Sequence, residues 1–314
     1  MCRSHSGEKL DALLTQVVGS LLHQNLVTLQ RVAQDGMRVR ASAGRSSFRK
    51  RDRLQRCLDK AREQVETLKT LSEEDPQELN RRQQAARERA ANERVERLEK
   101  ALEACDDVQQ KREENRSRHK NKPPRGSSTD PDARIMQMAD GGFRPAYNVQ
   151  FATDVDSGII VGVDVTNAGS DNGLMKPMAE QLQGRYGVSP QEYLADGGFA
   201  SLPDIDHLEE EHQCAVYTPI KDEQTKLEAG DDPYARTKRD TDATARWRQR
   251  MKTDAAKAIY KLRAQSAEWV NAVCRNHNLW QMPVRGQARA KAIGLLHALT
   301  HHLLQSLRLT PGGT

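Results

Sequence analysis

Glu268 stands in a segment whose residue types suit work on phosphate groups. If residues 260–276 form an α-helix, with 100° per residue, Tyr260, Glu268 and Arg275 fall on one side of it, and Arg263 lies at the margin of that side. The planar guanidinium of arginine can donate two parallel hydrogen bonds to phosphate oxygens. The spacing therefore predicts one acid placed among phosphate-binding groups.

Asp196 is a second acid in a distinctive setting. It follows a strand-like segment, residues 192–195, and it precedes Gly197 and Gly198. Two glycines allow a tight exit from a strand, which would leave the carboxylate exposed at the edge of a sheet. Hard divalent ions prefer carboxylate oxygens, so this placement suits a metal ligand.

These residues resemble those of the DDE transposases of bacterial insertion sequences. In a related branch of that family, the glutamate helix carries a tyrosine, two further residues, an arginine, a short gap and then the glutamate. Tyr260, Arg263 and Glu268 fit this order with a gap of four residues.

The resemblance also covers the first aspartate, which in such enzymes lies in an Asp-Gly context on the first strand. Here Asp35 and Gly36 stand in the apolar segment VAQDGMRV, residues 32–39. The resemblance continues through ADGGFRPAYNVQ, residues 139–150, and covers most of the chain from about residue 8. Its specificity comes from the order and context of the motifs, because an isolated Asp-Gly pair is common.

The resemblance implies an RNase H-like fold in which three acids hold two Mg²⁺ ions, with Mn²⁺ as a substitute. Asp35 would bridge the two ions, Asp196 would bind one and Glu268 the other. Tyr260, Arg263 and Arg275 would contact DNA. The implied partner is double-stranded DNA, first the terminal inverted repeats and then the target.

The implied reaction has two stages. Water frees a 3′-hydroxyl at the end of the element, and that hydroxyl then attacks a phosphodiester of the target DNA. A non-catalytic, DNA-binding remnant of a transposase is the alternative, and metal-dependent nicking distinguishes the two. A structural coiled-coil protein is a third interpretation of residues 47–121 alone, but the glycine-marked, β-rich stretch 140–220 argues against it.

Family members have a further helical region before the first catalytic strand, which serves end recognition and assembly. Only 34 residues precede Asp35 here, so the comparison predicts a chain truncated at its amino end. Such a chain could keep its acids and yet fail to pair DNA ends. The resemblance allows a homodimer for a full-length form.

Each site residue also has a plainer interpretation. Asp35 and Asp196 could simply begin turns, and Glu268 could be a solvated residue of a charged helix. Asp164, on a predicted hairpin, is the main rival for the role of first acid. The histidines of the last helix are expected to face core and solvent rather than a metal: His297, His301 and His302.

The composition suits a polyanionic partner without requiring one. Forty-nine lysines and arginines against 44 acids give the 314 residues a net charge of +5. Five dispersed cysteines form no C-x-x-C pair, which indicates a reducing environment and no zinc site. The sequence begins with no apolar signal region and has no membrane-length apolar run, so we expect a protein of the bacterial cytoplasm, associated with the nucleoid.

The order of elements predicts an α/β protein with an RNase H-like mixed sheet, flanked by helices and interrupted by a long charged helical hairpin. We expect a first helix and the first catalytic strand in residues 1–46. The hairpin and its linker would fill 47–126, because apolar residues recur at heptad-like intervals on either side of a break at residues 73–76. Residues 127–314 would supply the rest of the catalytic core.

Within that core, the pattern predicts a β-hairpin at 147–154 and 159–166 and strands at 192–195 and 215–218. Residues 221–242 read as a loop over the site, and one long helix from 243 to 276 would carry Glu268. The other predicted helices cover residues 8–24, 172–186, 202–212 and 288–307.

Overall fold

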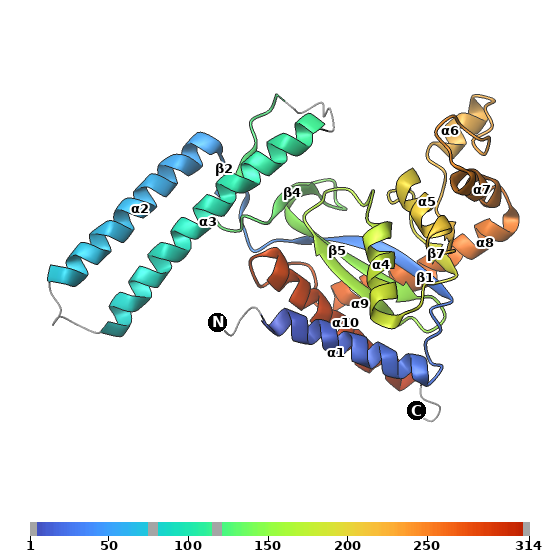
Figure 1. Ribbon diagram of the computed structural model, residues 1–314, viewed down its shortest axis with the longest axis horizontal. Coiled ribbons are helices and arrows are strands. Elements are labelled where there is room, and N and C mark those ends of the chain that lie inside the picture. The colour runs from blue at the N-terminus through green and yellow to red at the C-terminus, as the bar shows by residue number, and fades with distance from the viewer. Residues whose placement is uncertain (1–4, 75–80, 115–120, 310–314) are drawn as a thin grey trace. The chain divides into compact units, whose positions relative to one another are not determined.

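A computed structural model describes residues 5–74, 81–114 and 121–309 (Figure 1). The chain divides into two compact units. One, the sheet unit, comprises residues 1–39, 147–281 and 288–314. The other, the hairpin unit, comprises residues 40–146 and 282–287. Of the predicted break at residues 73–76, residues 73 and 74 are helical, and residues 75 and 76 lie outside the described residues.

The sheet unit is built on a mixed sheet in the order β6-β5-β1-β7-β8. Strands β5 and β6 are antiparallel, β1 pairs with β7 in parallel, and β7 pairs with β8 in parallel. This mixed α/β arrangement is consistent with the predicted RNase H-like fold. The strands are β1 (Arg31–Arg40), β5 (Phe143–Asp154), β6 (Ile160–Thr166), β7 (Glu192–Leu194) and β8 (Ala215–Tyr217).

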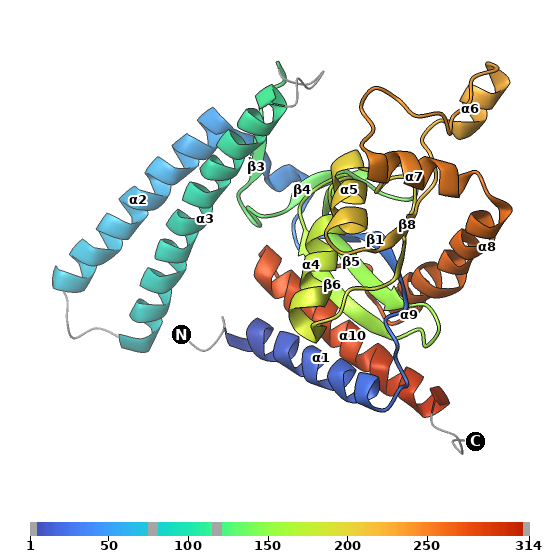
Figure 2. The same cartoon turned by 45° about the vertical axis from the view of Figure 1, so that its right-hand side comes forward.

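Helices cover both faces of the β5–β6 hairpin. A β-carbon placed on Gly162 would lie 2.5 Å from the sulfur of Met178 in α4 (Met175–Tyr186), so α4 packs closely on this face. One placed on Gly294, in α10 (Gln287–Leu309), would lie 3.3 Å from Val163. Since successive residues of a strand point to opposite faces, α4 and α10 lie on opposite sides of β6. Helix α1 (His5–His23) runs beside α10 in both views (Figures 1 and 2).

The remaining helices follow β7 and β8 along the chain. They are α5 (Leu202–Glu210), α6 (Glu223–Glu228), α7 (Asp242–Met251), α8 (Asp254–Arg263) and α9 (Trp269–Asn276). Helix α6 lies in the stretch that we expected to be a loop. The main apolar core joins side chains of α1, α4, α5 and the central strands, including Val18, Val32, Leu182, Tyr193 and Val216.

The expectation of one long helix over 243–276 is wrong. Thr253 caps a new helix by accepting a hydrogen bond from the backbone N–H of Ala256, with Asp254 in the first turn, and so α8 starts separately from α7. A π-helical turn, Ala264–Glu268, then joins α8 to α9. The sequence carried the capping signal at Thr253, but the apolar period continued across it.

The hairpin unit contains the predicted pair of charged helices. Helices α2 (Arg51–Glu74) and α3 (Arg81–Glu114) lie side by side and bury a narrow apolar seam (Figures 1 and 2). The seam has the residues that the heptad pattern predicted: Leu54, Leu58, Ala61, Leu98, Leu102 and Cys105. At its base, β2 (Phe48–Lys50) pairs with β3 (Arg125–Ser127), and β4 (Arg134–Gln137) pairs with residues 143–146 of β5. The sequence analysis did not predict these three short strands.

Candidate active site

Asp35 lies on β1, beyond the three residues of that strand that pair with β7. Its Oδ1 accepts the backbone N–H of Gly36 at 2.9 Å, and its Oδ2 accepts the side-chain amide of Asn271 at 2.9 Å. The pKa of Asp35 is raised to about 6, chiefly by burial; the positive charge of Arg263 opposes this rise, and the negative charge of Asp196 contributes to it. Asp35 is therefore a largely buried acid, with a side chain 16% exposed, whose pKa is influenced by the charge of Asp196.

The residue after Asp35 must be a glycine because two side chains lie very close to its backbone. A β-carbon at Gly36 would lie 2.4 Å from Nε2 of Gln150 and 2.5 Å from Oδ1 of Asp171. These distances are shorter than real β-carbon contacts, and Gln150 and Asp171 cannot easily withdraw because they bond to each other at 2.8 Å. The Asp-Gly pair thus lets β1 pass against a buried polar cluster.

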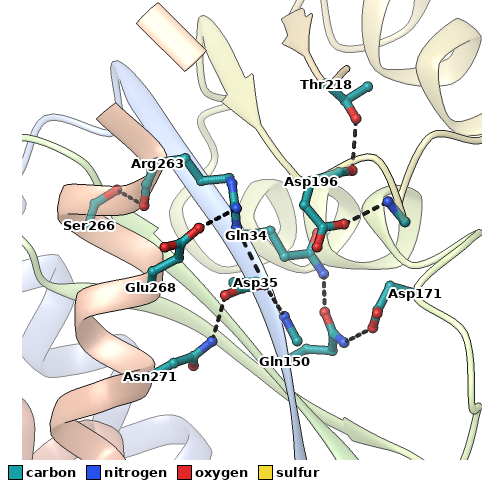
Figure 3. Close-up of polar contacts among 12 residues, drawn as sticks. Gln34, Asp35, Gln150, Asp171, Asp196, Thr218, Arg263, Ser266, Glu268 and Asn271 are labelled. Atoms are coloured by element: carbon teal, nitrogen blue, oxygen red, sulfur yellow. Dashed lines mark hydrogen bonds and ion pairs between the residues drawn. The ribbon is translucent and has the colours of Figure 1, made fainter. Parts of the chain in front are cut away.

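That polar cluster was not predicted. Asp171 accepts hydrogen bonds from Asn148 and Arg38. It also accepts one from Gln150, which in turn accepts one from Gln34 (Figure 3). Its members come from three segments: β1, β5 and the stretch between β6 and α4. In the sequence, the polar residues on the strands only interrupt apolar runs. Fully paired networks of this kind fix the backbone around them.

Asp196 lies two residues after the end of β7, close to the strand end that the sequence predicted. Its Oδ1 accepts the backbone N–H of Gly198 at 2.7 Å, and its backbone carbonyl accepts the hydroxyl of Thr218 at 2.8 Å. The first bond closes the turn on itself, and the second ties the turn to the residue after β8 (Figure 3). The carboxylate therefore has a defined position at the carboxyl edge of the parallel strands.

Glu268 ends the π-turn, and its side chain is half exposed. The guanidinium of Arg263 pairs with it through Nη2, and Nη1 of the same group lies 3.6 Å from Oδ1 of Asp35. Because Arg263 bridges the two acids, Glu268 and Asp35 face one site although 233 residues (268 − 35) separate them (Figure 3).

The π-turn explains how Arg263 and Glu268 meet. On a regular α-helix, residues five apart differ by about 140° and point in different directions. A π-helix has a wider turn, so residues five apart lie nearly above each other. The relative directions of Arg263 and Glu268 that we predicted from a continuous α-helix are therefore wrong across residues 264–268. Ser266 supports the turn, because its hydroxyl donates to the carbonyl of Leu262 at 3.0 Å.

Tyr260 and Arg275 take different positions around this site. The guanidinium of Arg263 lies over the ring of Tyr260, 5.8 Å from its centroid, so Tyr260 borders the bridging cation. Arg275 instead lies over the exposed ring of Trp280, at 5.8 Å. Only Tyr260 therefore contacts the group that links the acids.

The alternative residues have other partners. Asp164 pairs with Lys291 at 3.1 Å. His301 and His302 are buried, and their Nε2 atoms bond to the carbonyls of Gly158 and Ile160. Burial lowers the pKa of His302 to about 4. These residues thus serve the packing of α10 on the β5–β6 hairpin.

Asn271 is a contact of the site that sequence reasoning missed. It stands three residues after Glu268, a spacing that puts both on neighbouring parts of one helical surface. That spacing was the available signal, but an asparagine on a helix has no distinctive chemistry without its partner.

The donor chemistry of the site fits a hard divalent ion. Asp35, Asp196 and Glu268 offer carboxylate oxygens, and a cationic guanidinium already sits between two of them. Within the described residues, however, no three acidic, histidine or cysteine side chains stand close enough to form a metal-binding group. None of the described helices has the combination of length and apolar character needed to cross a membrane.

Comparison with known proteins adds the family. Neither curated proteins nor solved structures gave a match. The family model described as "Transposase DDE domain" matches residues 109–303, which is more than half of the chain. The matched stretch includes Asp196, Arg263 and Glu268, and it begins after Asp35. With this match over most of the sheet-forming sequence, the chain belongs to the transposase DDE domain family.

Proposed function

We propose that this protein is a DNA transposase that cleaves phosphodiesters at the ends of an insertion sequence and transfers the freed strand to target DNA. Family membership supports transposition in general. The observation that carries the finer proposal is the Arg263 bridge between Asp35 and Glu268, together with the effect of the Asp196 charge on Asp35. Acids from three distant segments thus act on one site.

In this proposal Asp35, Asp196 and Glu268 hold two Mg²⁺ ions. When bound, such ions activate an attacking oxygen and stabilise the leaving 3′ oxygen of a phosphodiester. The chain itself positions the acids: Gly198 holds Asp196 and Asn271 holds Asp35. Arg263, once released from the carboxylates, would donate to a phosphate of the DNA strand.

A non-catalytic, DNA-binding remnant is the second candidate. The observation that favours it is the lack of an assembled three-residue metal group among the described parts of the chain. In that case Arg263 would remain the permanent counter-ion of Asp35 and Glu268. The two candidates differ in whether the protein cuts DNA when a divalent ion is supplied.

The Asp196→Asn variant tests the proposal. It keeps the shape of the side chain and removes the charge that holds a hard ion, so cleavage of end-containing DNA with Mg²⁺ or Mn²⁺ should collapse while DNA affinity changes little. Asp164→Asn is the matched control, because Asp164 is an aspartate paired with Lys291, and it should cut normally. Equal cutting by Asp196→Asn would refute the assignment of Asp196. Binding without cutting by the wild type, with either ion, would favour the remnant.

A further inference from the structure

Asn271 connects the helix of one proposed catalytic acid to the side chain of another. It lies in α9, it is only 3% exposed, and its Nδ2 donates to Oδ2 of Asp35 at 2.9 Å (Figure 3). Asparagine is rarely buried to this degree without a specific polar partner. The contact is therefore a specific one between α9 and β1.

The hydrogen bond fixes the direction in which Asp35 presents its oxygens. A carboxylate oxygen has about two acceptor directions. Asn271 uses one direction on Oδ2, while the N–H of Gly36 uses one on Oδ1. With both oxygens held, the carboxylate cannot rotate freely. Each oxygen has one further acceptor direction, and on the Oδ1 side Nη1 of Arg263 lies 3.6 Å away.

The other end of the Asn271 amide has no partner among the described residues. Its Oδ1 is fully buried and accepts no hydrogen bond there. Leaving a buried carbonyl oxygen unpaired destabilises a protein, so such an atom is expected to have a functional partner. Beside a carboxylate that would bind a hydrated cation, it offers an acceptor for one water of the hydration shell.

We propose that Asn271 is a positioning residue for the metal-dependent reaction. Through Nδ2 it orients the Asp35 carboxylate toward a divalent ion, and through Oδ1 it supports the hydration shell of that ion. The inference rests on the proposed function, because it requires Asp35 to be a metal ligand. Residues that orient metal ligands in this way typically contribute about 10–100-fold to metal affinity.

The π-turn gives Asn271 its place in this arrangement. Glu268 ends the turn and Asn271 follows three residues later. The directions of both side chains therefore depend on the extra rotation of the helix at the π-turn. An ordinary α-helical turn at 264–268 would rotate α9 and move the amide away from Asp35. The same backbone irregularity thus places an acid and the group that orients its partner.

Metal binding by the free protein tests the role of Asn271. We expect Asn271→Leu, which keeps the volume and removes the amide, to bind Mn²⁺ about 10-fold more weakly, as followed by the EPR signal of the free ion. Asn276→Leu changes an exposed asparagine of the same helix and should bind Mn²⁺ like the wild type. If Asn271→Leu does not unfold cooperatively, Asn271→Ser replaces it, because a hydroxyl is polar and smaller but too short to reach Oδ2 of Asp35.

The outcomes separate this inference from the proposed function. A purely structural Asn271 would lower the melting temperature of the variant and leave the Mn²⁺ affinity of the folded protein unchanged, which would overturn the inference. Asp35→Asn is measured beside it. If Asp35→Asn weakens Mn²⁺ binding and the Asn271 variant does not, only the role of Asn271 is wrong. If Asp35→Asn leaves the affinity unchanged, the metal site and the role of Asn271 both fail.

Discussion

The guanidinium of Arg263 lies 3.6 Å from the carboxylate of Asp35, measured from Nη1 to Oδ1. Despite this cation, the pKa of Asp35 is about 6, because burial outweighs the attraction. Ionised Asp35 is thus poorly stabilised in the metal-free protein. Strained charges of this kind are typical of sites that gain their stability only when a ligand binds.

Asp35→Asn should stabilise the metal-free protein at neutral pH. The folded-state pKa of about 6 lies above the ordinary value of an aspartate, about 4. The folded state therefore holds this proton more tightly than the unfolded state, and stability falls as pH rises from about 4 to 6. Above pH 6 the full penalty is present, on the order of 1–3 kcal/mol. Asparagine carries no charge to desolvate and escapes the penalty.

The measurement is urea unfolding of wild type and Asp35→Asn between pH 4.5 and about 8, with a chelator present. The difference between the two proteins removes the effects of other titrating groups, such as His302. We expect the advantage of the variant to grow with pH up to about 6 and then level off. A difference that stays constant with pH would contradict the raised pKa.

Arg263→Gln should destabilise the metal-free protein by about 1–3 kcal/mol at pH 8, because two carboxylates lose their shared cation and Asp35 is buried. Arg246→Gln is the control, since it breaks an exposed ion pair with Glu210 and should cost almost nothing. Combining Arg263→Gln with Asp35→Asn should reduce the loss, as a double-mutant cycle by chemical unfolding would show. Additive effects would mean that the two residues do not interact.

Gly36→Ala should disturb the site although it adds only one methyl group. The new β-carbon would meet Gln150 and Asp171 at less than 2.6 Å, so β1 or the polar cluster must move, at a cost of about 1–3 kcal/mol. Gly184→Ala, in α4, has no atom within 4 Å of its new β-carbon and should stabilise by roughly 0.5–1 kcal/mol. Thermal unfolding compares the two, and equal effects would show that Gly36 has room.

The charged helix pair should be removable. Lys50 and Arg125 are register partners of an antiparallel pair, so their backbones are adjacent, and a glycine-serine linker of about five residues can replace 51–124. The apolar seam between α2 and α3 is filled by side chains of these two helices. Removing the helices should therefore leave the main apolar core of the sheet unit unchanged. We expect one cooperative unfolding transition, in which the free energy of unfolding depends less steeply on urea concentration because less surface is exposed. Loss of cooperativity would show that the helix pair is needed by the rest of the fold.

The sequence by itself determined the parts of the protein that depend on local pattern. Heptad spacing predicted the seam between α2 and α3, and period-two alternation predicted the β5–β6 hairpin. Glycines after Asp196 marked the end of β7. These features follow from periodicity and turn chemistry, which a single chain segment carries within itself.

Only the tertiary structure decided how the site is held. The π-turn at 264–268 is stabilised by Ser266 and by packing, and it changed the face on which Glu268 was expected. The bond from Asn271 to Asp35 spans 236 residues, and the cluster around Asp171 joins polar residues from separate strands and loops. Such contacts leave no periodic trace, because each needs the folded sheet to bring its partners within hydrogen-bonding distance.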